Sequence, residues 1–86
     1  MREIYQTKDI HVAAYIYAHT SITFAGLLDD GHDCLFQFQP ANKARELSEQ
    51  YYNRSGNIDA KKYVDALKTC KDILFNRLRE RRAEFS

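Results

Sequence analysis

The amino-acid sequence predicts a small α+β domain in which helices cover an antiparallel β-hairpin. Two observations lead to this fold class. Apolar side chains recur at helical spacing over residues 8–19 and again near the C-terminus, whereas residues 21–39 alternate apolar and polar side chains around a turn. The chain length suits one hydrophobic core. We therefore expect a single domain over 1–86, with loosely ordered termini at 1–6 and 82–86.

The first predicted helix covers residues 8–19. Four apolar side chains follow one another at i, i+3, i+4 and i+7: Ile10, Ala13, Ala14 and Tyr17. Thr7 is expected to cap the N-terminus, and Asp9 suits the positive end of the helix dipole. The pattern predicts an amphipathic helix with one buried stripe.

Residues 21–39 are predicted to form a hairpin. The Asp30-Gly31 pair is typical of a two-residue turn, but that turn would place Phe24 on the face opposite Phe36. A loop of three or five residues would instead gather the apolar side chains on one face: Ile22, Phe24, Leu28, Cys34, Phe36 and Phe38. We therefore expect a loop of odd length. Both hairpin edges would be open unless a terminal segment or a second copy pairs with one, so homodimerisation through an edge or through the long helix is an alternative.

Two helices are predicted after the hairpin. Pro40 is expected as the first residue of one helix, with Gly56 as its left-handed cap. The buried stripe of that helix would comprise Ala44, Leu47 and Tyr51. Asp59 is expected to cap a final long helix over residues 60–80. The predicted order of elements is α-β-β-α-α.

Charge is distributed unevenly along the chain. Residues 1–60 carry five basic and eight acidic side chains, a balance of −3, whereas residues 61–86 carry eight basic and four acidic, a balance of +4. This asymmetry favours an anionic partner for the C-terminal part. No apolar run is long enough to span a membrane, and the N-terminus lacks the apolar segment of a secretory signal. We expect a cytoplasmic protein without a membrane partner.

Several short motifs resemble a family of short uncharacterised proteins from bacteria, archaea and mobile elements. That family shares a Tyr-x-Thr-Lys-Asp start, a Phe-x-Phe strand, a Tyr-Tyr helix end and an Ala-Leu-x-x-x-Lys helix. The matching positions are Tyr5, Thr7, Lys8, Asp9, Phe36, Phe38, Tyr51, Tyr52, Ala66, Leu67 and Lys71. The likeness covers about residues 4–78. It implies a compact α+β domain and supplies no catalytic residue.

Candidate catalytic and metal-binding residues have simpler structural interpretations. The cluster near the hairpin tip could supply metal ligands: Asp29, Asp30, His32 and Asp33. However, Asp and Gly are common in hairpin loops because they favour turn conformations, whether or not a metal binds. Cys34 continues an apolar strand face and Cys70 an apolar helix face, so both are predicted to be core residues. We expect no enzyme activity, no cofactor and no metal site.

Two sets of side chains are candidates for binding. His11, Tyr15 and His19 follow at i, i+4 and i+8, and this line of rings could stack on nucleic-acid bases, dock a partner or be packed over by the C-terminal helix. The second set is basic and lies near the C-terminus: Lys71, Arg77, Arg79, Arg81 and Arg82.

On a helical wheel of the final predicted helix, the basic residues lie on two different sides. Arg77 and Arg81 project on the same side as the core stripe, so each is expected to meet an anion, either a carboxylate of this chain or of a second copy, or a phosphate. On the opposite face, Lys61–Asp65 and Lys68–Asp72 are predicted to form i,i+4 pairs.

The sequence thus favours a small non-catalytic binding domain that contacts nucleic-acid phosphate through the basic end of its last helix. The alternative is a homodimeric protein-interaction or scaffold module without nucleic-acid binding.

Overall fold

The computed structural model describes residues 3–84, apart from the side chains of Arg81, Ala83 and Glu84. The elements in this range are β1 (Tyr5–Thr7), α1 (Ile10–Tyr17), β2 (Thr23–Asp29), β3 (Cys34–Gln39), α2 (Ala41–Asn53) and α3 (Ala60–Glu84). The predicted α+β fold with a long C-terminal helix is confirmed. The predicted order lacked β1, which contains Tyr5 and Gln6 from a terminus expected to be loosely ordered.

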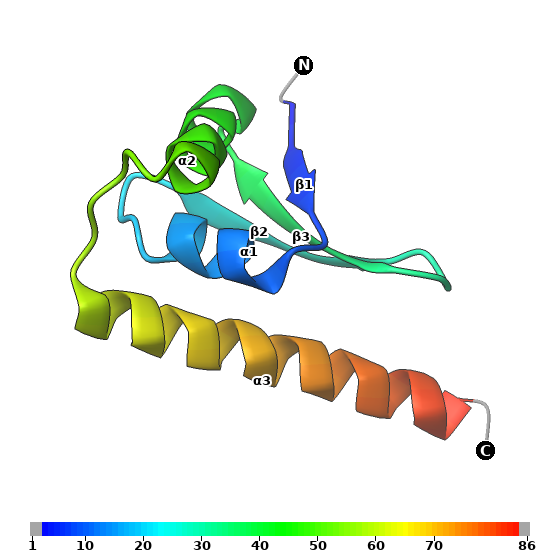
Figure 1. The fold of residues 1–86 in the computed structure, drawn as a ribbon. Helices are drawn as coiled ribbons and strands as arrows, with labels where there is room; N and C mark the ends of the chain where they lie inside the picture. The colour runs from blue at the N-terminus through cyan, green and yellow to red at the C-terminus, as the bar shows by residue number, and fades with distance from the viewer. Residues whose placement is uncertain (1–2, 85–86) are drawn as a thin grey trace.

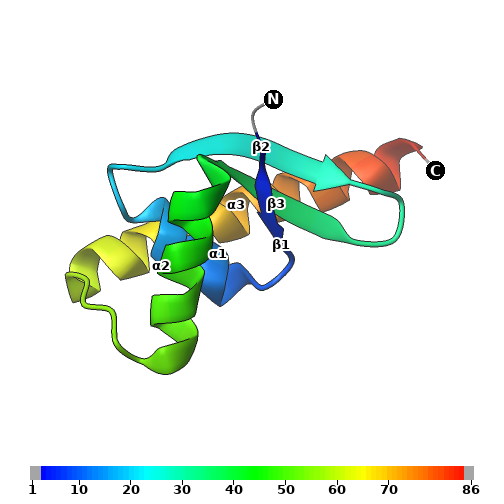
Figure 2. The same ribbon diagram turned by 90° about the horizontal axis from the view of Figure 1, so that it is seen from above.

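The elements are stacked around α1. Figure 1 shows the sheet above α1 and α3 below it, so that α1 lies between the two, and Figure 2 shows α2 beside the sheet, crossing over α1. At 1.5 Å per residue, the 25 residues of α3 span about 37 Å, which accounts for most of the molecule's longest dimension of 44 Å. The C-terminal half of α3 therefore extends beyond α1, beneath the far end of the hairpin (Figure 1).

The sheet has three antiparallel strands in the order β1-β3-β2. β1 pairs with the second strand of the hairpin, placing Tyr5 opposite Phe38 and Thr7 opposite Phe36. The alternative in which a terminal segment covers one hairpin edge is thus the one observed. A third strand also gives the hairpin the support that an isolated two-stranded ribbon lacks.

The hairpin loop is not of odd length. Asp29 pairs with Cys34, which leaves the four residues 30–33 as the connection. The extra residue that the apolar pattern requires lies within β2, as a bulge between Phe24 and Gly26. Gly26 has a φ of +128°, a conformation that an L-residue with a side chain rarely adopts.

The bulge changes which side chains of β2 reach the core. Beyond it, Leu27 pairs with the buried Phe36 and lies on the core side. Leu28, expected in the core, instead pairs with Leu35 on the opposite face and is 41% exposed. The predicted one-sided face was therefore correct for Phe24 and wrong for Leu28, because the register changes between them.

The first helix is shorter than predicted, and its central residues 12–16 are buried on all sides. Its cap is Asp9, not Thr7: the Asp9 carboxylate accepts hydrogen bonds from the backbone N–H groups of His11 (2.9 Å) and Val12 (3.4 Å). Five consecutive residues are buried: Val12, Ala13, Ala14, Tyr15 and Ile16. The predicted stripe is buried or partly buried, but the prediction of an amphipathic helix was wrong: Val12, Tyr15 and Ile16 on the other side are buried too, because α1 packs against a sheet and two helices.

The second helix also ends differently from the prediction. Pro40 precedes the helix as its N-cap, and Arg54, with a φ of +57°, is the left-handed residue that terminates it. Gly56 has another role. A Cβ atom at this position would overlap the hydroxyl and ring of Tyr15, so the absence of a side chain lets this segment pass close to α1.

We predict that Gly56→Ala lowers the free energy of unfolding by about 1–3 kcal/mol, because the added methyl group forces Tyr15 or the backbone to move. Urea denaturation followed by circular dichroism measures the change. Ser55→Ala, at the exposed neighbouring position, is the matched control and should change the value by less than about 0.5 kcal/mol. Equal stability of the two variants would contradict the close approach.

Candidate nucleic-acid interface

One face of α3 packs in the hydrophobic core. The Asp59 carboxylate caps the helix by accepting a hydrogen bond from the Lys61 backbone N–H (2.9 Å). Ala66 and Cys70 are buried against α1, and further partly buried side chains flank them: Tyr63, Leu67, Ile73 and Leu74. The helical wheel predicted these six positions as the core side of the helix, together with three others that are exposed: Val64 (60%), Phe75 (58%) and Leu78 (37%).

The opposite side of α3 is exposed and predominantly basic. At 100° per residue, and over residues 68–82, a set of exposed residues lies between about 100° and 180° from Cys70 around the helix axis. The set that we call the outer basic face comprises Lys68, Lys71, Phe75, Arg79 and Arg82. Two carboxylates, Asp65 and Asp72, border one side of it.

The cations of the outer basic face are not neutralised within the described part of the chain. The predicted Lys61–Asp65 and Lys68–Asp72 pairs are absent from the ion pairs among the described side chains. Lys71, Arg79 and Arg82 likewise form no ion pair with any side chain that the structure describes. Four cations therefore project into solvent along one side of the helix.

Arg77 behaves differently, as its place on the core side predicted. Its Nε lies 3.3 Å from Asp29 Oδ2, and its Nη1 donates a hydrogen bond to Glu80 Oε2 (3.0 Å). The Asp29 side chain is only 5% exposed. Of the anions considered for Arg77, the structure supplies carboxylates of this chain, and the one from Asp29 ties α3 to the end of the hairpin. The side chain of Arg81 lies outside the described residues.

The line of rings on α1 is not an exposed surface. Tyr15 is 5% exposed, donates a hydrogen bond from its hydroxyl to Gln50 Oε1 (3.1 Å) and packs against the ring of Tyr51. It is covered by α2, whereas the alternative considered from sequence was covering by the C-terminal helix. His19 Nδ1 lies 2.7 Å from the carbonyl oxygen of Tyr15. Of the three residues, only His11 is exposed, beside Asp9.

The acidic residues at the hairpin tip organise the turn. Asp29 Oδ1 accepts a hydrogen bond from the Gly31 N–H, and Asp30 Oδ1 accepts from the N–H groups of His32 and Asp33. The donors at Asp33 and His32 lower the pKa of the Asp30 carboxyl. Among the described residues, no three His, Cys, Asp or Glu side chains are grouped as they would be around a metal ion.

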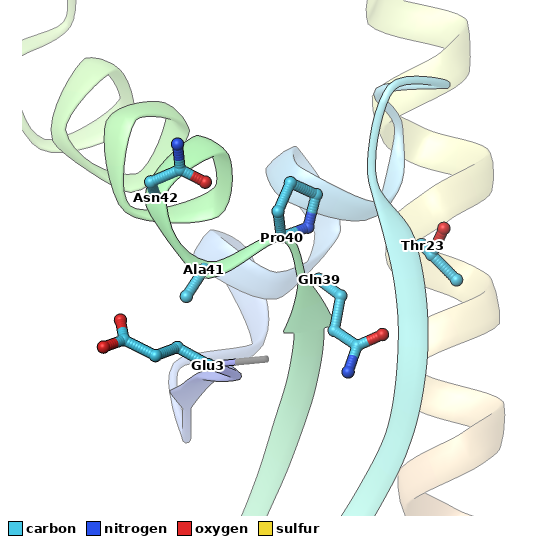
Figure 3. A pocket seen from close by; sticks show the side chains of 6 residues that line it. All are labelled: Glu3, Thr23, Gln39, Pro40, Ala41 and Asn42. Carbon is cyan, nitrogen blue, oxygen red and sulfur yellow. The ribbon is translucent and has the colours of Figure 1, made fainter. Parts of the chain in front are cut away.

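A hollow lies elsewhere on the described part of the molecule. Its volume is about 440 Å³, and it is lined by Glu3, Thr23, Gln39, Pro40, Ala41 and Asn42 (Figure 3). Thr23 and Gln39 pair across the strands next to the core pair Phe24 and Phe38, so they point to the opposite face of the sheet. The hollow thus opens away from α1 and is separate from the outer basic face.

In comparisons with known proteins, neither a family model, nor a curated protein, nor a solved structure matches the chain. The resemblance to a family of short proteins therefore stays a prediction. None of the helices described here combines the length and apolar character needed to cross a membrane.

We predict that the Asp29–Arg77 ion pair couples the hairpin to α3. A double-mutant cycle of Asp29→Asn and Arg77→Met should give a coupling free energy of about 1 kcal/mol in urea unfolding, since one partner is almost fully buried. Asn at position 29 keeps the oxygen that accepts from Gly31. Arg79→Met is the control, and its coupling to Asp29→Asn should be near zero because Arg79 is exposed on the other side of the helix.

Burial raises the pKa of the Cys70 thiol from 9.0 to about 11. The folded chain therefore holds this proton over a pH range in which the unfolded chain releases it, so the free energy of unfolding falls as pH rises from about 9 to 11. We predict that this decline, measured by urea unfolding at several pH values, is smaller in Cys70→Ala than in the wild-type chain. Parallel declines in the two proteins would show that the buried thiol does not titrate in this way.

Proposed function

We propose that the chain is a non-catalytic binding domain that contacts nucleic-acid phosphate through the outer basic face of α3. The observation that carries the proposal is the set of four exposed cations (Lys68, Lys71, Arg79 and Arg82) without an ion pair among the described side chains. From Lys68 to Arg82 the helix rises about 21 Å. Such a row of cations suits a partner whose negative charges repeat along a line, as phosphates do.

The basic residues named from the sequence differ in whether they form an ion pair with the rest of the described chain. Lys71, Arg79 and Arg82 belong to the proposed contact surface, and Lys68 joins them because its expected partner, Asp72, does not pair with it. Arg77 supports the surface indirectly, through the ion pair that ties α3 to the hairpin. His11 is exposed but lies on α1, and Tyr15 is buried, so neither has a part in the proposal.

Self-association through the same surface is electrostatically unfavourable. Two copies packed through their outer basic faces would bring lysines and arginines together, with Asp65 and Asp72 only at the border. The homodimeric scaffold hypothesis therefore requires another surface, and the charge of α3 favours an anionic partner instead.

We predict that a fluorescein-labelled 20-nucleotide strand binds the chain with an affinity that falls steeply with salt. For four phosphate contacts, the slope of log K against log salt concentration should be about −3, which corresponds to a loss of about 50-fold between 50 and 200 mM salt. The combined variant Lys71→Ala, Arg79→Ala and Arg82→Ala should reduce the slope to about −1. Fluorescence anisotropy measures both quantities.

A triple variant with the same net charge controls for nonspecific electrostatics. Lys43→Ala, Arg45→Ala and Lys62→Ala remove three exposed cations away from the outer basic face and should leave the slope near −3. Light scattering of the same samples gives the mass of the complex. A dimer mass that does not change on addition of nucleic acid, with no anisotropy signal, would overturn the proposal in favour of the scaffold hypothesis.

A further inference from the structure

A single aromatic ring lies among the cations of the outer basic face. Phe75 is 58% exposed, although a phenylalanine side chain is usually buried. Lys71 precedes it by four residues and Arg79 follows it by four, so both are its neighbours on the helix surface. Arg82, seven residues later, and Lys68, seven residues earlier, lie on the same side about 10 Å along the axis.

This arrangement has the two components that proteins use to hold single-stranded nucleic acid. Cations follow the phosphate backbone, while an exposed aromatic ring provides a flat surface on which a base can stack. In a duplex the bases are already stacked on one another, so an exposed ring has no base face to contact. Resting on the proposed function, we infer that the nucleic acid is single-stranded and that one of its bases stacks on Phe75 while Lys71 and Arg79 contact the flanking phosphates.

Two other partners fit this surface less well. In the major groove of a duplex the lysines and arginines could read base edges, but a phenylalanine ring reaches only a thymine methyl group there, so a duplex uses Phe75 less fully than base stacking does. An acidic amphipathic helix needs a continuous apolar stripe to pack against. The exposed large apolar side chains in the described part of α3 are Val64, Phe75 and Leu78, and Lys68 and Lys71 separate the first from the other two.

The test compares three fluorescein-labelled probes by anisotropy in moderate salt: a 12-nucleotide oligothymidylate, an abasic strand with the same number of phosphates, and a 12-base-pair duplex. The wild-type chain should bind oligothymidylate about 5- to 100-fold more tightly than the abasic strand, since stacking requires the base. Phe75→Leu keeps an apolar side chain and should lower the affinity for oligothymidylate to that for the abasic strand. Its affinity for the abasic strand itself should not change.

A tryptophan variant provides a direct signal and a rescue. The chain has no tryptophan, so Phe75→Trp introduces one fluorophore whose emission should be quenched by oligothymidylate and not by the abasic strand. The affinity of this variant should equal or exceed that of the wild type. Val64→Ala, at an exposed apolar position of α3 eleven residues before Phe75, is the matched control and should bind all probes as the wild type does. Thermal unfolding of each variant checks that its fold is retained.

The outcomes separate this inference from the proposed function. Equal binding of oligothymidylate and the abasic strand, unaffected by Phe75→Leu, would overturn base stacking and leave phosphate contact in place. Tighter binding of the duplex than of oligothymidylate would also overturn it. Binding of none of the three probes would overturn the proposed function itself, and binding of a polyglutamate peptide in their place would identify an acidic protein as the partner.

Discussion

The packing of α1 is the constraint on which the rest of the structure depends. Its five central side chains are 5% exposed or less, so the sheet, α2 and α3 must each contribute a surface to cover it. A helix of eight residues is too short to be stable in water by itself. The central element therefore forms only together with the layers around it, and we expect the domain to fold as one cooperative unit.

This architecture leaves one surface under little structural constraint. Only one side of α3 contacts α1, and the helix continues past α1 beneath the hairpin (Figure 1). Side chains on its outer side can therefore change without disturbing the core, and polar residues of either charge would be tolerated there. The chain instead has cations and an exposed phenylalanine on this side. Arg77 limits the freedom of this segment, because its ion pair with Asp29 holds the helix against the hairpin.

The sequence predicts the fold class and the inner side of α3, because both follow from periodic apolar patterns that extend over many residues. It does not predict features that depend on contacts between distant segments. The three-residue β1 is too short to leave a pattern, and the burial of Tyr15 depends on Gln50 and Gly56 from elsewhere in the chain. At the candidate site, the cations could be named from the sequence, but which of them form ion pairs within the chain could not. Whether a cation is paired depends on where the hairpin places Asp29.

The bulge in β2 has a consequence beyond the register of the hairpin. β2 is one of the two edge strands of the sheet, and an edge strand exposes backbone donors and acceptors to which a strand from another molecule can bond. The irregularity at Gly26 interrupts the regular spacing of those groups near the middle of the strand. The same extra residue that brings both Phe24 and Leu27 to the core thus disfavours edge-to-edge pairing along β2.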